Sequence, residues 1–199
     1  MSSVVQICNI ALSNIGEQRI TALTDNNERA RLCNLRYDDV RDAVLRSYPF
    51  KCAVQRVELA LSADAPAWGY TKKYALPADC LRVLDIENYF EDYEIEGRFI
   101  VTDATQIKLK YIYRVEDPNQ FDSLTIQAIA LKLASELAEA LTGRADLRDR
   151  MLAKYLQVIS EARGVDSQER SMPQIIVAED YLNSRLVGST FRRAKFSDE

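Results

Sequence analysis

The residue types that most often carry catalysis are scarce in this sequence. Its 199 residues include no histidine, which removes the commonest general base and metal ligand and every Ser-His or Cys-His nucleophile pair. The six glycines are isolated from one another, so the sequence has neither a phosphate-binding loop nor a dinucleotide fingerprint. These absences argue against hydrolases and nucleotide-dependent enzymes, and we expect no catalytic residues and no cofactor.

The cysteines are too far apart in the sequence to suggest a metal site. They are Cys8, Cys33, Cys52 and Cys80, without any CxxC spacing or nearby histidine. Such an arrangement is typical of buried thiols in a cytosolic protein. We therefore expect no bound metal.

One enzymatic alternative survives, because glycoside hydrolysis needs only two suitably spaced carboxylates. Five acidic side chains crowd one short stretch of the chain: Glu87, Glu91, Asp92, Glu94 and Glu96. An acidic run beside a hairpin is more often a solvated strand edge that discourages aggregation. We predict that the protein is not an enzyme, and a carboxylate-based cell-wall glycan hydrolase remains the less favoured alternative.

Composition and charge narrow the possible partners. The chain is 47% hydrophobic and 28% charged, and it has no apolar run of about 18 residues that would suggest a membrane partner. Its first residues lack the features of a secretory signal, so we expect a protein made and kept in a cytosol. The net charge of −4 disfavours a tight grip on phosphates. A mildly acidic chain can nevertheless line a channel through which DNA slides.

Two amphipathic helices are expected in the first part of the chain. The first has Ser2 or Ser3 as its N-cap and ends at Gly16. The second runs up to Pro49, with Asp25 and Glu28 placed as a variant of the capping box. On its polar side we expect helix-spaced ion pairs. These are Asp38 with Arg41 and Asp42 with Arg46.

The period of the hydrophobic pattern then changes from that of a helix to that of a strand. Alternation is clearest from Ile107 to Val115. Shorter strands are expected at Leu81–Ile86, Tyr93–Ile95 and Phe99–Val101, with a hairpin turn at Glu96–Gly97. Trp68, Tyr70 and Tyr74 supply bulky residues suited to a pleated surface. Residues 62–116 are therefore predicted to form a small antiparallel β unit.

Two further helices complete the expected fold. Asp122 or Ser123 caps a third helix that stops at Gly143, and a fourth ends near Gly164. We predict a mainly α fold, a four-helix bundle with a small antiparallel β insert between helices 2 and 3 and an extended C-terminal tail. The bundle comprises residues 1–61 and 117–167, the insert 62–116 and the tail 168–199.

The tail is too apolar for a solvated linker and is locally basic, which is typical of a segment that docks on a partner. Packing back on its own bundle is the alternative. The residues expected to dock are Tyr181, Leu182, Arg185, Leu186, Phe191, Arg192, Arg193, Lys195 and Phe196.

Several segments together resemble one protein family. In chain order they are Ile7–Glu17 with Ile20–Leu23, Leu45–Phe50, Tyr74–Val83 and Tyr181–Arg185. Their combination and order resemble the tail tubular protein A family of short-tailed bacteriophages, whose members are head-to-tail adaptors. The resemblance spans nearly the whole chain.

The resemblance implies a structural connector at the head-tail junction of the virion, assembled in the host cytoplasm. Its subunits would form a homo-oligomeric ring, a dodecamer, between the portal protein and the tail nozzle protein. DNA would pass through the ring without sequence-specific binding, and the tail would dock on the portal. The charged helix faces at 28–46 and 144–163 are candidates for the ring contacts. The alternative is a small cytoplasmic protein-binding module that uses the Tyr-rich β surface.

Overall fold

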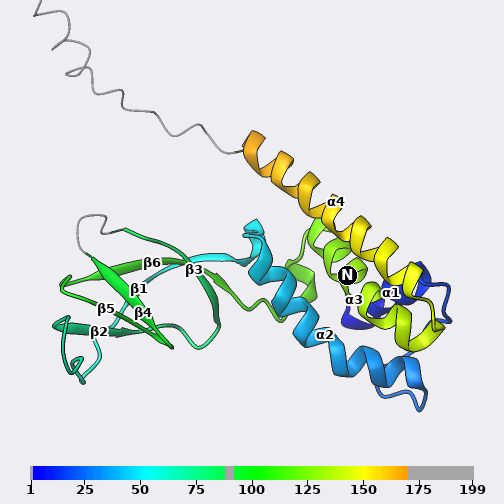
Figure 1. The fold of residues 1–199 in the computed structure, drawn as a ribbon, viewed down its shortest axis with the longest axis horizontal. Coiled ribbons are helices and arrows are strands. Elements are labelled where there is room, and N and C mark those ends of the chain that lie inside the picture. The colour runs from blue at the N-terminus through cyan, green and yellow to red at the C-terminus, as the bar shows by residue number, and fades with distance from the viewer. Residues whose placement is uncertain (1, 88–91, 170–199) are drawn as a thin grey trace, which may run out of the picture. The chain divides into compact units, whose positions relative to one another are not determined.

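The computed structural model describes residues 2–87 and 92–169 (Figure 1). Met1–Arg163 form one compact unit and Gly164–Glu199 belong to a second. The helices are α1 (Val4–Asn14), α2 (Glu28–Ser47), α3 (Ser123–Thr142) and α4 (Ala145–Glu169). The strands are β1 (Val54–Leu59), β2 (Lys72–Ala75), β3 (Cys80–Ile86), β4 (Tyr93–Glu96), β5 (Phe99–Thr102) and β6 (Ile107–Tyr113). No helix within these described ranges is both long enough and apolar enough to span a membrane.

The prediction of a mainly α fold is wrong, and the protein is mixed α/β. Its strands form two three-stranded antiparallel sheets, ordered β1-β6-β3 and β2-β5-β4, in place of one small insert. Strand β1 lies within residues 1–61, which we predicted to be part of the helical bundle. Two features obscured β1: its inward side carries the polar Gln55, and charged Arg56 and Glu58 occupy the opposite side.

Caps and glycines set the helix ends. Ser3 accepts a hydrogen bond from the backbone N–H of Gln6 at 3.1 Å, and Asp122 caps α3 in the same way through Thr125. Gly143 ends α3 at a φ of +66°, a conformation that favours glycine. The predicted cap of the second helix is wrong, because Asn27 accepts from the N–H of Ala30 at 2.8 Å and Asp25 does not cap α2.

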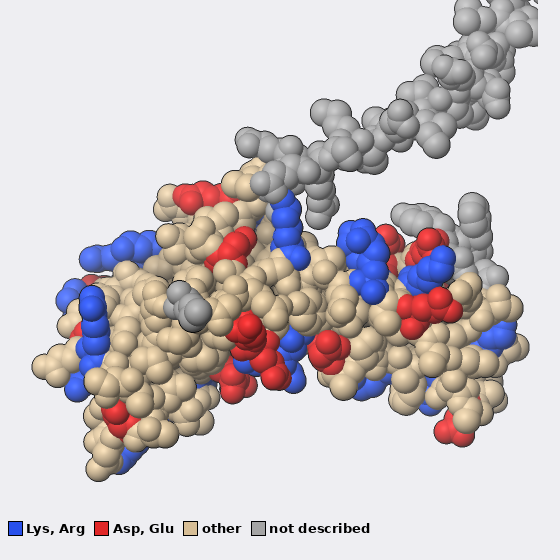
Figure 2. All heavy atoms as spheres, turned by 180° about the vertical axis from the view of Figure 1, so that it is seen from behind, with Lys and Arg blue, Asp and Glu red and all other residues tan. Residues whose placement is uncertain are grey.

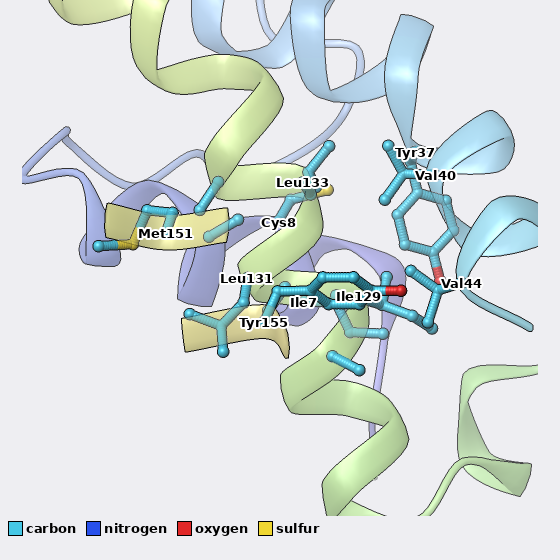
Figure 3. Close-up of a cluster of buried hydrophobic side chains, with 14 of the residues drawn as sticks. Ile7, Cys8, Tyr37, Val40, Val44, Ile129, Leu131, Leu133, Met151 and Tyr155 are labelled. Carbon is cyan, nitrogen blue, oxygen red and sulfur yellow. The ribbon is translucent and has the colours of Figure 1, made fainter. Parts of the chain in front are cut away.

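The larger hydrophobic core lies among the helices. Apolar side chains of α1, α2 and α3 meet there, and Met151 and Tyr155 of α4 pack on them (Figure 3). Tyr155 also shares a hydrogen bond of 3.0 Å with Ser47 of α2. Burial of such side chains contributes about 1.5–3 kcal/mol each relative to exposure, so this cluster dominates the stability of the helical part.

The second core lies between the two sheets. It is formed by side chains such as Ile107 and Leu109 of β6 and Ile100 of β5. Tyr74 of β2 is buried there, and its hydroxyl donates to the backbone oxygen of Ala104 at 2.8 Å. A buried hydroxyl needs such a partner. The sheets therefore pack face to face as a small sandwich.

Sheet β1-β6-β3 joins the two cores. Ile107, Leu109 and Tyr111 of β6 face the sandwich, whereas Ile112 of the same strand belongs to the helical core. Polar contacts follow the same junction: the Arg46 guanidinium donates to the backbone oxygen of Leu81. Arg114 pairs with Asp42 at 2.7 Å. Helices and strands thus share one continuous packed structure within Met1–Arg163.

Candidate protein-binding surface

The predicted docking tail lies outside the described residues, apart from positions 168 and 169, which belong to the end of α4. All nine of its predicted docking residues, from Tyr181 to Phe196, lie outside the described residues. Within the described residues, the candidate surfaces for partner binding belong to the sheets and to the exposed sides of the helices.

The most exposed large apolar side chain described is Trp68, which is 88% accessible. It lies in the loop between β1 and β2, after Pro66 and before Gly69, whose φ is +87°. The prediction that Trp68 and Tyr70 lie on a pleated surface is wrong, because neither is part of a strand. The flanking Pro and Gly were the sequence signal for a loop. Exposed tryptophans are costly to solvate and are enriched at binding sites.

A hollow of about 440 Å³ separates this loop from the outer side of sheet β2-β5-β4. Its floor consists of Lys73, Val101, Glu94 and Glu96, which come from all three strands. The loop supplies the wall: Ala65, Pro66, Ala67, Trp68, Gly69 and Tyr70. The hollow thus combines two aromatic side chains with two carboxylates.

The charge of this hollow is predominantly negative. Partial desolvation raises the pKa of the Tyr70 hydroxyl, and the carboxylates of Glu94 and Asp92 raise it further. A tyrosinate would lie beside these negative charges, so the neutral hydroxyl is favoured. The one lysine on the floor, Lys73, places its ammonium 4.0 Å from the centre of the Phe99 ring. No basic side chain of the described residues forms a salt bridge with Glu94 or Glu96.

Strand β4 borders the hollow and is an edge of its sheet. Among the described strands it pairs only with β5, on one side. Its side chains alternate between acidic Glu94 and Glu96 and apolar Tyr93 and Ile95, which are 43% and 49% exposed. Because successive side chains of a strand point to opposite faces, one side of β4 is acidic and the other apolar.

The described carboxylates of the acidic run, at positions 87, 92, 94 and 96, are exposed and are not held in an apolar cleft. Glu94 and Glu96 are exposed, whereas a general acid needs burial to stay protonated near neutral pH. Glu87 forms a salt bridge with Lys108 at 2.7 Å, and Glu91 lies outside the described residues. The cysteines are free thiols. No cluster of three or more metal-binding side chains occurs in the described part of the chain.

The helix faces proposed for ring contacts carry charges and a few exposed leucines. Asp38 and Arg41 of α2 pair at 2.9 Å as predicted. The predicted pair of Asp42 with Arg46 is wrong, because Asp42 contacts Arg41 and Arg114. Leu35 of α2 is 66% exposed, and Leu152 and Leu156 are exposed one turn apart on α4.

Comparison with models of protein families and with curated proteins finds no match for this sequence.

Proposed function

We propose that this protein is a structural head-to-tail connector subunit of a short-tailed bacteriophage. It would assemble into a ring between the portal protein and the tail nozzle protein, and DNA would pass through the ring. The observation that carries the proposal is the ordered set of segments that resemble the tail tubular protein A family. No single segment is specific, and their combination along the chain is what supports the family.

The places of these segments in the fold are consistent with a shared architecture. In the first segment, the Asn9 amide donates to the backbone oxygen of Ile20 at 2.9 Å and accepts from its N–H at 2.8 Å. In the second, Tyr48 and Phe50 pack edge to face with ring centres 5.0 Å apart. These contacts fix how the chain leaves α1 and α2. The resemblance at these positions therefore supports a similar fold and does not point to a catalytic group.

The third segment, Tyr74–Val83, connects the two sheets. It contains the end of β2 and the start of β3, with Tyr74 buried in the sandwich and Leu81 packed against the helical core. The segment therefore contributes to both cores. This is again a position where the architecture of the fold constrains the residue types.

The surface charge is compatible with a channel through which DNA passes without being tightly bound. Acidic and basic side chains are interspersed on the face shown in Figure 2, and the net charge is −4. Retention of DNA needs clustered Lys and Arg that release counterions. We therefore propose that DNA contacts in the ring are weak and independent of sequence.

Native mass spectrometry of the chain with the portal ring from the same genome tests the proposal. We expect a discrete complex with one chain per portal subunit. Removing residues 179–199 should weaken attachment without unfolding the helices, as checked by circular dichroism. Added salt should weaken attachment if the basic tail residues meet acidic portal groups, because the Debye length is about 10 Å at 0.1 M salt. No association at any salt concentration would refute the connector.

A second candidate function is a protein-binding module that acts without ring assembly. The exposure of Trp68 above an acidic hollow favours it, since aromatic side chains and desolvated pockets dominate binding energies. The two candidates differ in stoichiometry. A binding module would bind its partner as a single chain, whereas a connector would be present in multiple copies around a portal ring.

A further inference from the structure

We propose that the open edge of β4 binds an extended segment of a partner protein in which apolar and basic residues alternate. The segment would add a fourth strand to sheet β2-β5-β4. Its apolar side chains would cover Tyr93 and Ile95, and its Lys or Arg side chains would lie beside Glu94, Glu96 and Trp68. The proposal rests on the geometry of this edge and does not depend on the head-to-tail function.

The backbone of β4 is available for pairing at two residues. The carbonyl of Arg98 points away from β4, because it accepts from the N–H of Leu76, the residue after β2, at 2.9 Å. Hydrogen-bonding directions alternate along a strand, so Phe99 and Val101 of β5 face β4 and bond with their partners Glu96 and Glu94. The N–H and C=O groups of Tyr93 and Ile95 therefore face the open edge. Exposed groups of this kind are a template for an added strand.

One side of the edge offers apolar contacts. Ile95 pairs with Ile100, and Ile100 pairs with Tyr74, so all three lie on the side of the sheet that faces the sandwich. Ile100 and Tyr74 are buried, whereas Ile95 and its neighbour Tyr93 remain about half exposed. An apolar side chain on an added strand would extend the sandwich core over them.

The other side of the edge selects positive charge. Glu94 and Glu96 line the hollow beneath Trp68 and Tyr70, without a salt-bridge partner among the described residues. Opposite charges on neighbouring strands stabilise pairing, and a cation over a tryptophan face gains a further attraction. Both features favour Lys or Arg at every second position. An acidic segment would be repelled.

Trp68 makes the proposal directly measurable, because it is the only tryptophan in the chain. Its fluorescence therefore reports on this hollow alone. We would titrate the full-length protein with a hexapeptide that alternates Val and Lys. Two controls are a peptide of the same composition with three Val before three Lys, and a peptide that alternates Val and Glu. A saturable change in Trp68 emission with the first peptide only is the expected result, and no change with any peptide overturns the proposal.

Two substitutions at one position separate backbone pairing from side-chain contact. Ile95→Pro removes the N–H that faces the open edge and leaves the bonds between β4 and β5, and proline is tolerated on edge strands. Ile95→Ala retains the N–H. We expect Ile95→Pro to weaken the alternating peptide by at least about tenfold relative to Ile95→Ala. Equal affinities of the two variants would overturn strand addition.

Charge reversal provides a second test that does not depend on proline. Glu94→Lys/Glu96→Lys should abolish binding of the Val-Lys peptide and gain binding of the Val-Glu peptide. Glu161→Lys, an exposed acid on α4, is the control and should bind as the wild type does. Unchanged selectivity in the double variant would overturn the proposed recognition of charge.

This chain itself offers a competing occupant. Residues 193–196 alternate as Arg193, Ala194, Lys195 and Phe196. A peptide of residues 191–196 is therefore included in the titration. Tighter binding of this peptide than of the Val-Lys peptide would assign the edge to the C-terminal segment of this chain and overturn the proposal of a separate partner.

Discussion

Asn9 illustrates how a single polar side chain connects two segments of the helical part. Its amide group donates to and accepts from the backbone of Ile20, eleven positions along the chain. The paired backbone groups are thereby satisfied at a site where Ile20 itself is buried. An unsatisfied polar group in such a place costs about 1–3 kcal/mol, so this pairing stabilises the turn between α1 and α2.

We predict that Asn9→Ala lowers the free energy of unfolding by about 1–3 kcal/mol, because the Ile20 N–H and C=O lose their partner. Urea denaturation followed by circular dichroism measures the change. Asn14→Ala at the end of the same helix is the control and should change stability by less than about 0.5 kcal/mol. Equal effects of the two substitutions would show that the Asn9 hydrogen bonds contribute nothing specific.

The cysteines should react slowly with a thiol reagent while the protein is folded. Burial raises the pKa of Cys52 and Cys80. A hydrogen bond with Cys33, together with burial, raises the pKa of Cys8 far above its usual range. The same hydrogen bond lowers the pKa of Cys33, so the protection of this thiol comes from its complete burial. The thiolate is the reactive form, so all four thiols should be protected at pH 8 and titrate rapidly in urea. A cysteine that reacts at once in the native protein would contradict this.

At the scale of elements, the sequence predicted helices better than strands. The caps at Ser3 and Asp122 and the stops at Gly16 and Gly143 follow from local rules, and the structure has them. The predicted end of the fourth helix near Gly164 is wrong, because α4 continues to Glu169. Strand β1 escaped prediction because its inward Gln55 breaks the apolar alternation. A polar residue at this position is explained by a contact between strands, because Gln55 accepts a hydrogen bond from the Tyr111 hydroxyl of β6 at 3.0 Å.

The candidate surface was predicted only in part. Glu94 and Glu96 of the acidic run lie on an edge strand, as predicted, whereas Trp68 lies in a loop and not on the pleated surface that we predicted for it. Whether a large aromatic residue lies in a core or stands in solvent depends on what packs against it. A sequence pattern alone carries little of that information, and here Pro66 and Gly69 were the only local indication.

The turn before α2 gives a pH-dependent prediction. Backbone hydrogen bonds from Thr21 and Ala22 lower the pKa of the Asp25 carboxyl. A lowered folded-state pKa stabilises the protein above the unfolded pKa of about 3.9, and the contribution disappears as the pH falls through the folded value. Asp25→Asn should therefore destabilise the protein at pH 7, and the difference from wild type should shrink below about pH 4.

Urea midpoints measured from pH 2.5 to 7 test this expectation. Asp39→Asn, an exposed acid on α2, is the control and should show little dependence on pH. A difference between wild type and Asp25→Asn that is constant across the whole range would rule out the ionised carboxylate as the acceptor.

At the scale of the whole molecule, strand β6 joins two cores. Ile112 contributes to the helical core, and its neighbour Tyr111 contributes to the sandwich. The helices and the sheets therefore cannot lose their packing independently. We expect Met1–Arg163 to unfold as one cooperative unit.

We predict that Ile112→Ala destabilises this unit by about 2–5 kcal/mol, because it leaves a cavity at a fully buried position. Far-UV circular dichroism would follow the helices, and pulsed thiol labelling of Cys80, which belongs to the sandwich core, would follow the sandwich. Both should shift to the same lower urea midpoint. Ile95→Ala, half exposed on β4, is the control. Two separated transitions would show that the cores are independent.

The order of the elements along the chain has a consequence for how the protein is made. The helices α1 and α2 pack mainly against α3, yet α3 is encoded after the whole pair of sheets. Domains generally fold during synthesis from the N-terminus. In this protein the side chains that α3 covers stay exposed while the ribosome translates the six strands. They include Ile7, Leu12 and Val44. The nascent chain is therefore most exposed to aggregation and to chaperones during this interval, and it becomes protected only once α3 has emerged.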